Sequence, residues 1–200
     1  SSLLLTSCIN AEITENINND WIANITMKMD ISKLNTIMEE QAKQSWSWAI
    51  KMTQSKPCEK NDTQLTNYKC TLIDKDHYTI EWTLDLSQSW VFHSQNWIYI
   101  LNISQSMIWL EKEKTNTIYK EKTQESIKQE KQMYAMMWME IYSNIKMPWK
   151  LAKYEIGALS WEYLRINYAD LISVDNLYIV STENNTSEEE INTFLNKIKA

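Results

Sequence analysis

Cys58 and Cys70 carry the first recognisable chemistry in this 200-residue chain, because two cysteines around a short polar stretch can form a disulfide. Disulfides persist in exported proteins, whose surroundings are oxidising. Closing a loop of this length stabilises a fold by roughly 3 kcal/mol and requires Cα atoms within about 7 Å. A metal site that includes His77 would need four clustered ligands, and the sequence offers no others nearby. We therefore predict a Cys58–Cys70 disulfide and no metal site.

Cys8 is a candidate for a different modification, the attachment of a lipid. The segment 3–8 reads LLLTSC, a leucine run followed by small residues and the cysteine. This order is typical of the cleavage site of a signal peptide, and Leu5-Thr6-Ser7-Cys8 resembles a bacterial lipobox. Residues 1–8 are therefore predicted to be the end of a signal peptide, with Cys8 lipidated as the mature N-terminus. The alternative is a buried first strand with a free cysteine.

No catalytic residue is predicted. An enzyme should combine a nucleophile with a base, pair two carboxylates, or cluster metal ligands. His77 falls on the polar face of an expected strand and His93 in a polar turn, and neither has an evident acid partner in the sequence. The nucleophile motif G-x-S-x-G is absent from the chain. We therefore expect neither catalysis nor a cofactor.

Composition limits the remaining classes of function. The net charge is −6, and basic and acidic residues are mixed along the chain, so the basic patch of a nucleic-acid-binding protein is not expected. No apolar run reaches the length of a membrane span. The length suits one domain, which we place at residues 9–200.

Tryptophan and glycine occur in abnormal numbers. The chain has 10 Trp and 1 Gly, whereas glycine is usually about 7% of residues. Many of the tryptophans follow turn-forming residues, as in Asp20-Trp21, Ser45-Trp46, Ser47-Trp48, Ser89-Trp90, Asn96-Trp97, Pro148-Trp149 and Ser160-Trp161. Such turns favour glycine, which adopts positive φ without strain. We hypothesise that most tryptophans stand where the natural protein carries glycine; a Trp-rich core or a redesigned sequence is the alternative.

Trp21 is the position at which this hypothesis can be tested most directly. It ends Asn19-Asp20-Trp21, between two segments that alternate apolar and polar residues. An Asp-Gly pair in this position is a strong hairpin signal, and the two-residue turn that it favours needs positive φ at both central residues. We therefore expect Trp21 to be strained and largely exposed, and its replacement by glycine to stabilise the chain by about 1 kcal/mol.

The element pattern predicts an α+β fold, with a curved antiparallel sheet built from hairpins. Alternation in 9–17 and 23–29 predicts the first hairpin, and the segment 139–180 is expected to form the centre of the sheet. Two packed helices are predicted at about 31–44 and 187–198, with 121–137 as a further candidate. The second of these begins with the capping box Ser187 to Glu190.

Several short motifs resemble the LppM-like domain of bacterial envelope lipoproteins. They are the lipobox cysteine, the Asn-Asp hairpin, MKMDISKL at 27–34, YTIE at 78–81 and IKMPWK at 145–150. Trp21 and Trp149 stand where this family has glycine. The resemblance implies an α+β lipoprotein domain on the extracytoplasmic face of the cell envelope, held to the membrane by an N-terminal lipid. It implies no catalytic residue.

Three functions are compatible with these observations. The first is an envelope-anchored, non-enzymatic binding or interaction domain. The second is a carrier that holds an apolar or lipid ligand between its sheet and a helix, which would require a cavity with apolar walls. The third is a small hydrolase whose site the sequence does not reveal.

Overall fold

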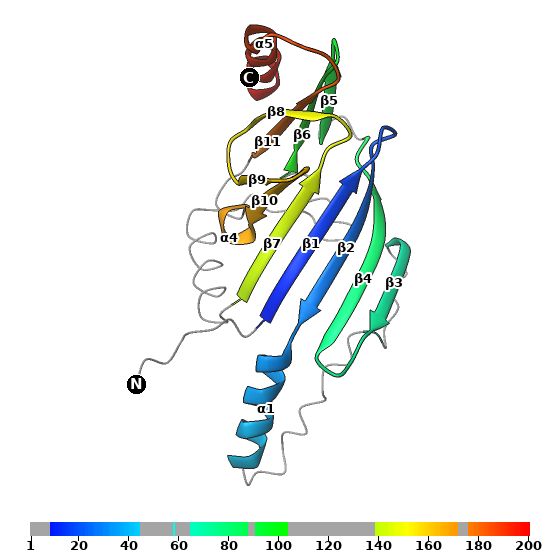
Figure 1. The fold of residues 1–200 in the computed structure, drawn as a ribbon, viewed down its shortest axis with the longest axis vertical. Helices are drawn as coiled ribbons and strands as arrows, with labels where there is room; N and C mark the ends of the chain where they lie inside the picture. Colours follow the sequence, from blue (N-terminus) through cyan, green and yellow to red (C-terminus); the bar gives the residue numbers. More distant parts are fainter. Residues whose placement is uncertain (1–8, 45–57, 59–64, 88–90, 104–138, 172–175) are drawn as a thin grey trace, which may run out of the picture.

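The computed structural model describes residues 9–44, 58, 65–87, 91–103, 139–171 and 176–200. Within them the chain forms two sheets and three helices, an α+β fold (Figure 1). The seven-stranded sheet has the order β3-β4-β2-β1-β7-β10-β9 and the four-stranded sheet the order β5-β6-β11-β8. No helix of the described residues has the length and hydropathy needed to cross a bilayer.

The strands of the larger sheet are β1 (Ile9–Ile17), β2 (Ile22–Asp30), β3 (Thr66–Leu72), β4 (His77–Asp85), β7 (Met139–Lys146), β9 (Ala158–Ser160) and β10 (Tyr163–Asn167). Those of the smaller sheet are β5 (Phe92–Gln95), β6 (Ile98–Asn102), β8 (Lys150–Tyr154) and β11 (Tyr178–Thr182). The helices are α1 (Ser32–Gln44), α4 (Tyr168–Leu171) and α5 (Glu188–Lys199), so both expected helices near 31–44 and 187–198 are present. The candidate helix 121–137 lies outside the described residues.

The two sheets share one core, because the alternating apolar residues of each sheet face the other. Ile25 and Ile145 from the larger sheet lie in the same buried cluster as Leu101 and Ile179 from the smaller sheet. Helix α5 covers the opposite face of the smaller sheet, where Phe194 and Leu195 pack with strand residues. Ser187 and Glu190 form the predicted capping box, which sets the start of this helix.

The sequence predicted that the segment 139–180 forms the centre of one antiparallel sheet, and this prediction was wrong. Its strands β7, β9 and β10 belong to the larger sheet, whereas β8 and β11 belong to the smaller one. Strand β7 also pairs with β1 in parallel, while the other neighbouring pairs are antiparallel. A long connection between β1 and β7 permits a parallel pair, whereas a tight hairpin would not. The alternation within a strand is the same in both cases.

The first hairpin turns differently from the prediction. The N–H of Trp21 donates to the carbonyl of Asn18 at 3.0 Å, and the Asn18 side chain accepts from Asp20 and Ile22. Of residues 18–21 only Trp21 has positive φ, at 63°. This is a longer loop that ends in a left-handed residue, where glycine is the usual choice. The expected exposure of Trp21 was wrong, because its side chain is only 9% exposed.

Two further hairpins place tryptophan in positions that favour glycine. Gln95 pairs with Ile98, which leaves Asn96 and Trp97 as a two-residue turn with φ of 51° and 65°. This is the geometry in which Asn-Gly is strongly preferred. Ser160 pairs with Tyr163, and Trp161 begins the connecting turn with φ of 57°. A positive φ at this first turn position again favours glycine.

Among the five tryptophans of the described residues, three therefore have positive φ: Trp21, Trp97 and Trp161. A fourth, Trp82, is buried in the middle of β4, and its indole N–H has no hydrogen-bond partner in the described structure. Buried indole N–H groups usually find an acceptor. The chain's single glycine, Gly157, also has positive φ, and a Cβ there would lie 2.7 Å from the carbonyl oxygen of Arg165. These geometries support the substitution hypothesis, which stays a prediction.

We expect Trp161→Gly to raise the free energy of unfolding by about 1 kcal/mol. The Trp161 side chain is 94% exposed, so its removal sacrifices little packing. A left-handed conformation is unfavourable for a residue with a Cβ by roughly 1–2 kcal/mol, and glycine removes this strain at some entropic cost. Urea unfolding of the variant and the parent chain measures the difference. An unchanged or lower unfolding midpoint would argue against strain at this turn.

Candidate functional site

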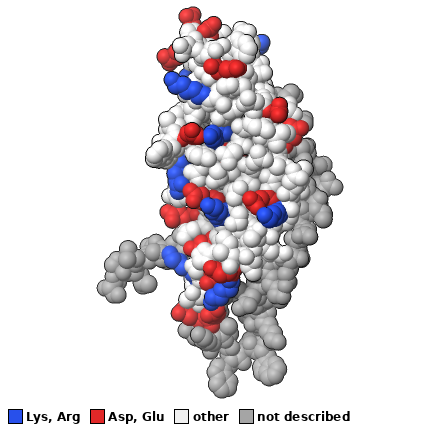
Figure 2. Space-filling model, turned by 45° about the vertical axis from the view of Figure 1, so that its right-hand side comes forward, with Lys and Arg blue, Asp and Glu red and all other residues white. Residues whose placement is uncertain are grey.

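Charged side chains of both signs are interspersed over the face of the molecule that Figure 2 shows. Lysine and arginine lie beside aspartate and glutamate on this face and do not gather into one basic area. Non-specific binding to nucleic acid requires such an area.

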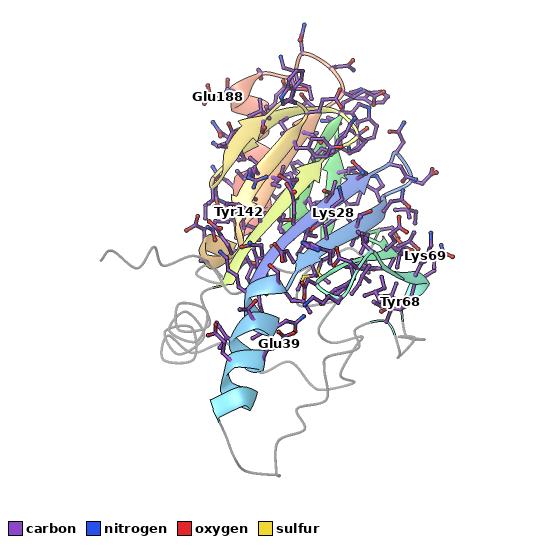
Figure 3. All side chains as sticks on the ribbon, turned by 60° about the horizontal axis from the view of Figure 1, so that its bottom comes forward. Lys28, Glu39, Tyr68, Lys69, Tyr142 and Glu188 are labelled. Carbon is purple, nitrogen blue, oxygen red and sulfur yellow. A yellow bond between two sulfur atoms is a disulfide. The ribbon has the colours of Figure 1, made fainter. Side chains whose placement is uncertain are left out.

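A hydrogen-bonded network crosses the outer face of the larger sheet. The guanidinium of Arg165 on β10 donates to Glu12 at 2.9 Å and to the Asn144 side-chain oxygen at 3.1 Å. The Asn144 amide in turn donates to Glu12 at 3.0 Å, and the Arg165 guanidinium carbon lies 4.1 Å from the Tyr142 ring centroid. Figure 3 labels Tyr142 on β7, one of the strands involved. The hydrogen bond from Arg165 holds the pKa of Glu12 below its usual value. The network ties β1, β7 and β10 together and leaves no nucleophile beside a base.

Glu15 is a carboxylic acid on the apolar side of β1. Its side chain falls on the same face of β1 as those of Ile13 and Ile17, both of which contribute to the shared core. Its parallel partner on β7 is Ile145. The hydroxyl of Ser143 donates to its carboxyl at 3.2 Å. Burial raises the pKa of Glu15 to about 7, although the Ser143 hydrogen bond opposes this shift. The sequence did not single out Glu15 as a buried titratable residue, although its place between Ile13 and Ile17 on the apolar face was the available signal.

We expect Glu15→Gln to remove a loss of stability that the parent chain shows between about pH 4.5 and 7. Below the unfolded pKa the carboxyl is protonated in both states. Between the two pKa values the unfolded chain releases a proton that the folded chain keeps, so stability falls as the pH rises. The shift corresponds to roughly 3 kcal/mol at most, and partial solvation of this half-buried residue lowers the expected loss to about 1–2 kcal/mol.

Urea unfolding at pH 5 and pH 8 measures this loss, with Glu12→Gln as the matched control. The folded pKa of Glu12 is lowered, so its contribution to stability is present above the unfolded pKa and is lost as the pH falls. Both pH values lie above that window, so Glu12→Gln should leave the fall in stability between pH 5 and pH 8 unchanged, whereas Glu15→Gln should remove it. A Glu15→Gln variant with the pH dependence of the parent would contradict the raised pKa.

His77 has an acid partner, contrary to the sequence analysis. Its Nδ1 lies 2.8 Å from a carboxyl oxygen of Asp74, and its Nε2 lies 3.5 Å from Asp30. The hydrogen bond to Asp74 raises the pKa of His77. Asp74 also accepts the backbone N–H groups of Asp76 and His77, which shapes the β3–β4 turn. Both partners are well exposed, so the pair lies at the surface.

The His77–Asp74 pair is local in the sequence. Asp74 precedes His77 by three residues in a polar turn, a local spacing that could have revealed the pair. No group of three or more potential metal ligands is present among the described residues. His93, at the start of the smaller sheet, is half-buried, and burial lowers its pKa.

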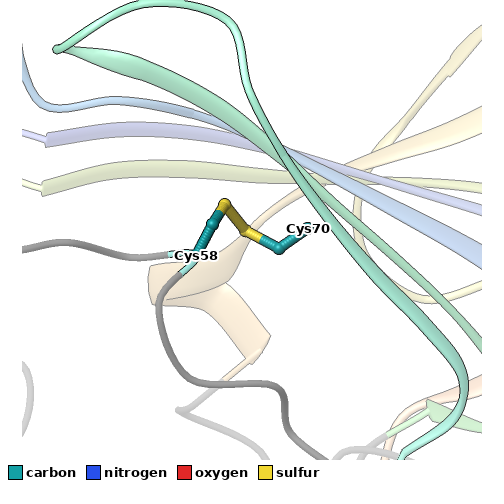
Figure 4. The surroundings of a disulfide bond; sticks show 2 residues. All are labelled: Cys58 and Cys70. Atoms are coloured by element: carbon teal, nitrogen blue, oxygen red, sulfur yellow. A yellow bond between two sulfur atoms is a disulfide. The ribbon is translucent and has the colours of Figure 1, made fainter.

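The disulfide expected from the sequence joins Cys58 to Cys70, with Cα atoms 5.3 Å apart (Figure 4). Cys70 belongs to β3, an edge strand of the larger sheet, so the bond fastens Cys58 to that edge. Cys8, the predicted lipidation site, lies outside the described residues. The described residues begin at Ile9, the next residue, which is the first of β1.

A groove of about 610 Å³ lies between β8, the loop 183–186 and the first turn of α5. Its walls include Lys150 and Lys153 on one side and Glu183 and Glu188 on the other. The ammonium of Lys153 donates to the Asn192 side chain at 2.6 Å, which links β8 to α5 across the sheet face. A groove of this volume can hold a small ligand, and its polar walls suit a polar one.

Comparison with known proteins gives little guidance. No protein-family model matches the chain, and no curated protein matches it. Among solved structures, it is similar to the NMR structure of the folded domain of LppM from Mycobacterium tuberculosis. That likeness has a TM-score of 0.42 and 8% sequence identity, and it covers 94% of this chain and 97% of the other.

Proposed function

We propose that the chain is a bacterial lipoprotein of the cell envelope, held to the membrane by a lipid on Cys8 and exposed on the extracytoplasmic side. The arrangement of its cysteines carries this proposal. The sequence has 3 cysteines, and Cys58 and Cys70 are joined in a disulfide. That bond suits an oxidising compartment and leaves Cys8 as the one cysteine of the sequence outside it.

The position of Cys8 also supports an anchor. It follows LLLTS and directly precedes β1. In the larger sheet β1 pairs antiparallel with β2 and parallel with β7. Cleavage before Cys8 would remove no residue of the described fold. The folded domain would then start one residue after its lipid, and residues 9–200 would be displayed as a single unit.

We expect Cys8→Ser to abolish incorporation of labelled fatty acid into the precursor and its partition into detergent. Several acyl chains hold a protein firmly, at about 0.8 kcal/mol per buried CH₂, whereas the domain has no other proposed anchor of that strength. The Cys58→Ser/Cys70→Ser variant is the matched control, since it also loses cysteines but should keep the label. Unchanged labelling and partition in Cys8→Ser would overturn the proposed anchor.

The domain itself is proposed to bind a partner without catalysing a reaction. The polar groove beside α5 supports a binding function, and its charged walls fit a polar ligand better than an apolar one. The carrier alternative would need apolar space between the sheet and α5, but Ile191, Phe194 and Leu195 pack there and are nearly buried. Mass spectrometry of lipids extracted from the purified protein separates the two, because a carrier should retain stoichiometric lipid.

A further inference from the structure

The tip of the β3–β4 hairpin exposes two consecutive large aliphatic side chains. Leu72 is 55% exposed and Ile73 is 66% exposed. The turn that follows is held in a fixed shape, because the N–H groups of Ile73 and Asp74 both donate to the carbonyl of His77. A rigid turn cannot withdraw these side chains into the core, so they stay in contact with solvent unless a partner covers them.

This tip lies at the end of the larger sheet where β1 begins. Asn10 on β1 pairs with Asp30 on β2, and Asp30 pairs with His77 on β4. The backbone carbonyl of His77 accepts the N–H of Ile73. The strand order places β2 and β4 between β1 and β3. With neighbouring strands about 4.8 Å apart, Ile73 lies roughly 15 Å across the sheet from the start of β1. A lipid attached to Cys8 would therefore hold the tip close to the bilayer.

Helix α1 leaves the sheet at this same end (Figure 1) and runs beside the tip, with Glu39 labelled along it in Figure 3. The Asn35 amide donates to Asp76 at 2.8 Å, and Lys75 pairs with Glu39 at 3.7 Å. These contacts fix the first turns of α1 against the hairpin.

We propose that Leu72 and Ile73 form a contact surface for the bilayer to which Cys8 attaches the chain. This inference rests on the proposed lipid anchor. Large aliphatic side chains gain free energy on leaving water, and an attached lipid makes the contact intramolecular, so a small apolar area is enough. Asp74, Lys75, Asp76 and His77 give the tip mixed charge, so the contact depends on apolar burial and not on anionic lipid.

In the experiment that tests this proposal, a lipid is attached to Cys8 by chemical coupling. Chain 8–200 is coupled through Cys8 to a maleimide lipid in neutral phosphatidylcholine vesicles, while Cys58 and Cys70 are protected by their disulfide. Amide hydrogen exchange of residues 72–76 is then compared with that of the uncoupled chain. We expect exchange to slow at least threefold on coupling, and Leu72→Ser/Ile73→Ser to remove the slowing. Leu159→Ser is the matched control, because Leu159 is also 55% exposed but its register places it near the other end of β1.

The possible outcomes separate this proposal from the anchor itself. Equal exchange rates at 72–76 with and without coupling would overturn the bilayer contact. Such a result would leave the proposed lipidation of Cys8 standing, because fatty-acid labelling tests it independently. Slowing that grows with the surface density of the coupled chain would show that a second copy covers the tip, and would also overturn it. Uncoupled variants with parental exchange elsewhere in the sheet confirm that the substitutions do not unfold the chain.

Discussion

Removing the Cys58–Cys70 disulfide is expected to lower the free energy of unfolding by about 3 kcal/mol. The two cysteines are 12 residues apart, and opening a loop of that length restores entropy to the unfolded chain. The bond also joins Cys58 to β3, which has only β4 as a neighbour in the sheet. Loss of the bond should therefore loosen that edge first. Urea unfolding of Cys58→Ser/Cys70→Ser against the parent measures the effect.

Reductant provides the control for this prediction. It should destabilise the parent chain by a similar amount and leave the double serine variant unchanged, because that variant has no disulfide to lose. A parent chain with the same unfolding midpoint in oxidising and reducing conditions would contradict a stabilising disulfide. It would also remove the strongest support for export to an oxidising compartment.

Trp21→Gly is expected to lower the free energy of unfolding by about 2 kcal/mol, opposite in sign to the expectation from sequence. The Trp21 ring stacks on Phe92 with centroids 3.5 Å apart, and it lies 5.4 Å from Tyr99 and 5.8 Å from Trp149. Truncating a packed tryptophan costs roughly 3–5 kcal/mol, whereas relief of the left-handed backbone returns about 1–2 kcal/mol. Packing therefore outweighs strain at this position.

Trp161→Gly is the matched control, because Trp161 has a similar φ but an exposed ring. The two substitutions should shift the unfolding midpoint in opposite directions, Trp21→Gly downward and Trp161→Gly upward. A stabilising Trp21→Gly would show that the aromatic packing contributes less than the strain. Mass spectrometry of the native product, read beside its gene, decides whether these positions carry tryptophan or glycine in the natural protein.

Local patterns predicted the parts of this fold that local physics determines. The alternation over 9–17 and 23–29 gave the first hairpin, and the capping box at Ser187 gave the start of α5. Alternation identifies which residues of a strand share a face, and capping identifies where a helix can begin. Neither requires knowledge of the partner element, so both could be predicted from the sequence.

The features that the prediction missed depend on contacts between distant segments. The burial of Trp21 results from Phe92 and Tyr99, which arrive from the smaller sheet. The parallel pairing of β1 with β7 joins residues more than 120 positions apart and leaves the alternation of each strand unchanged. The same alternation left open which sheet each strand of 139–180 would join, because both sheets contribute apolar faces to one core.

The mass of the mature N-terminal peptide tests the central claim most directly. The full-length precursor is expressed in a bacterial host, recovered from the membrane fraction and digested, and the peptide that contains Ile9 and Asn10 is identified. We predict that this peptide begins at Cys8 and carries covalently bound fatty acid. A peptide that still contains Thr6 and Ser7, or one that begins at an unmodified Cys8, would contradict the proposal of an envelope lipoprotein anchored at this residue.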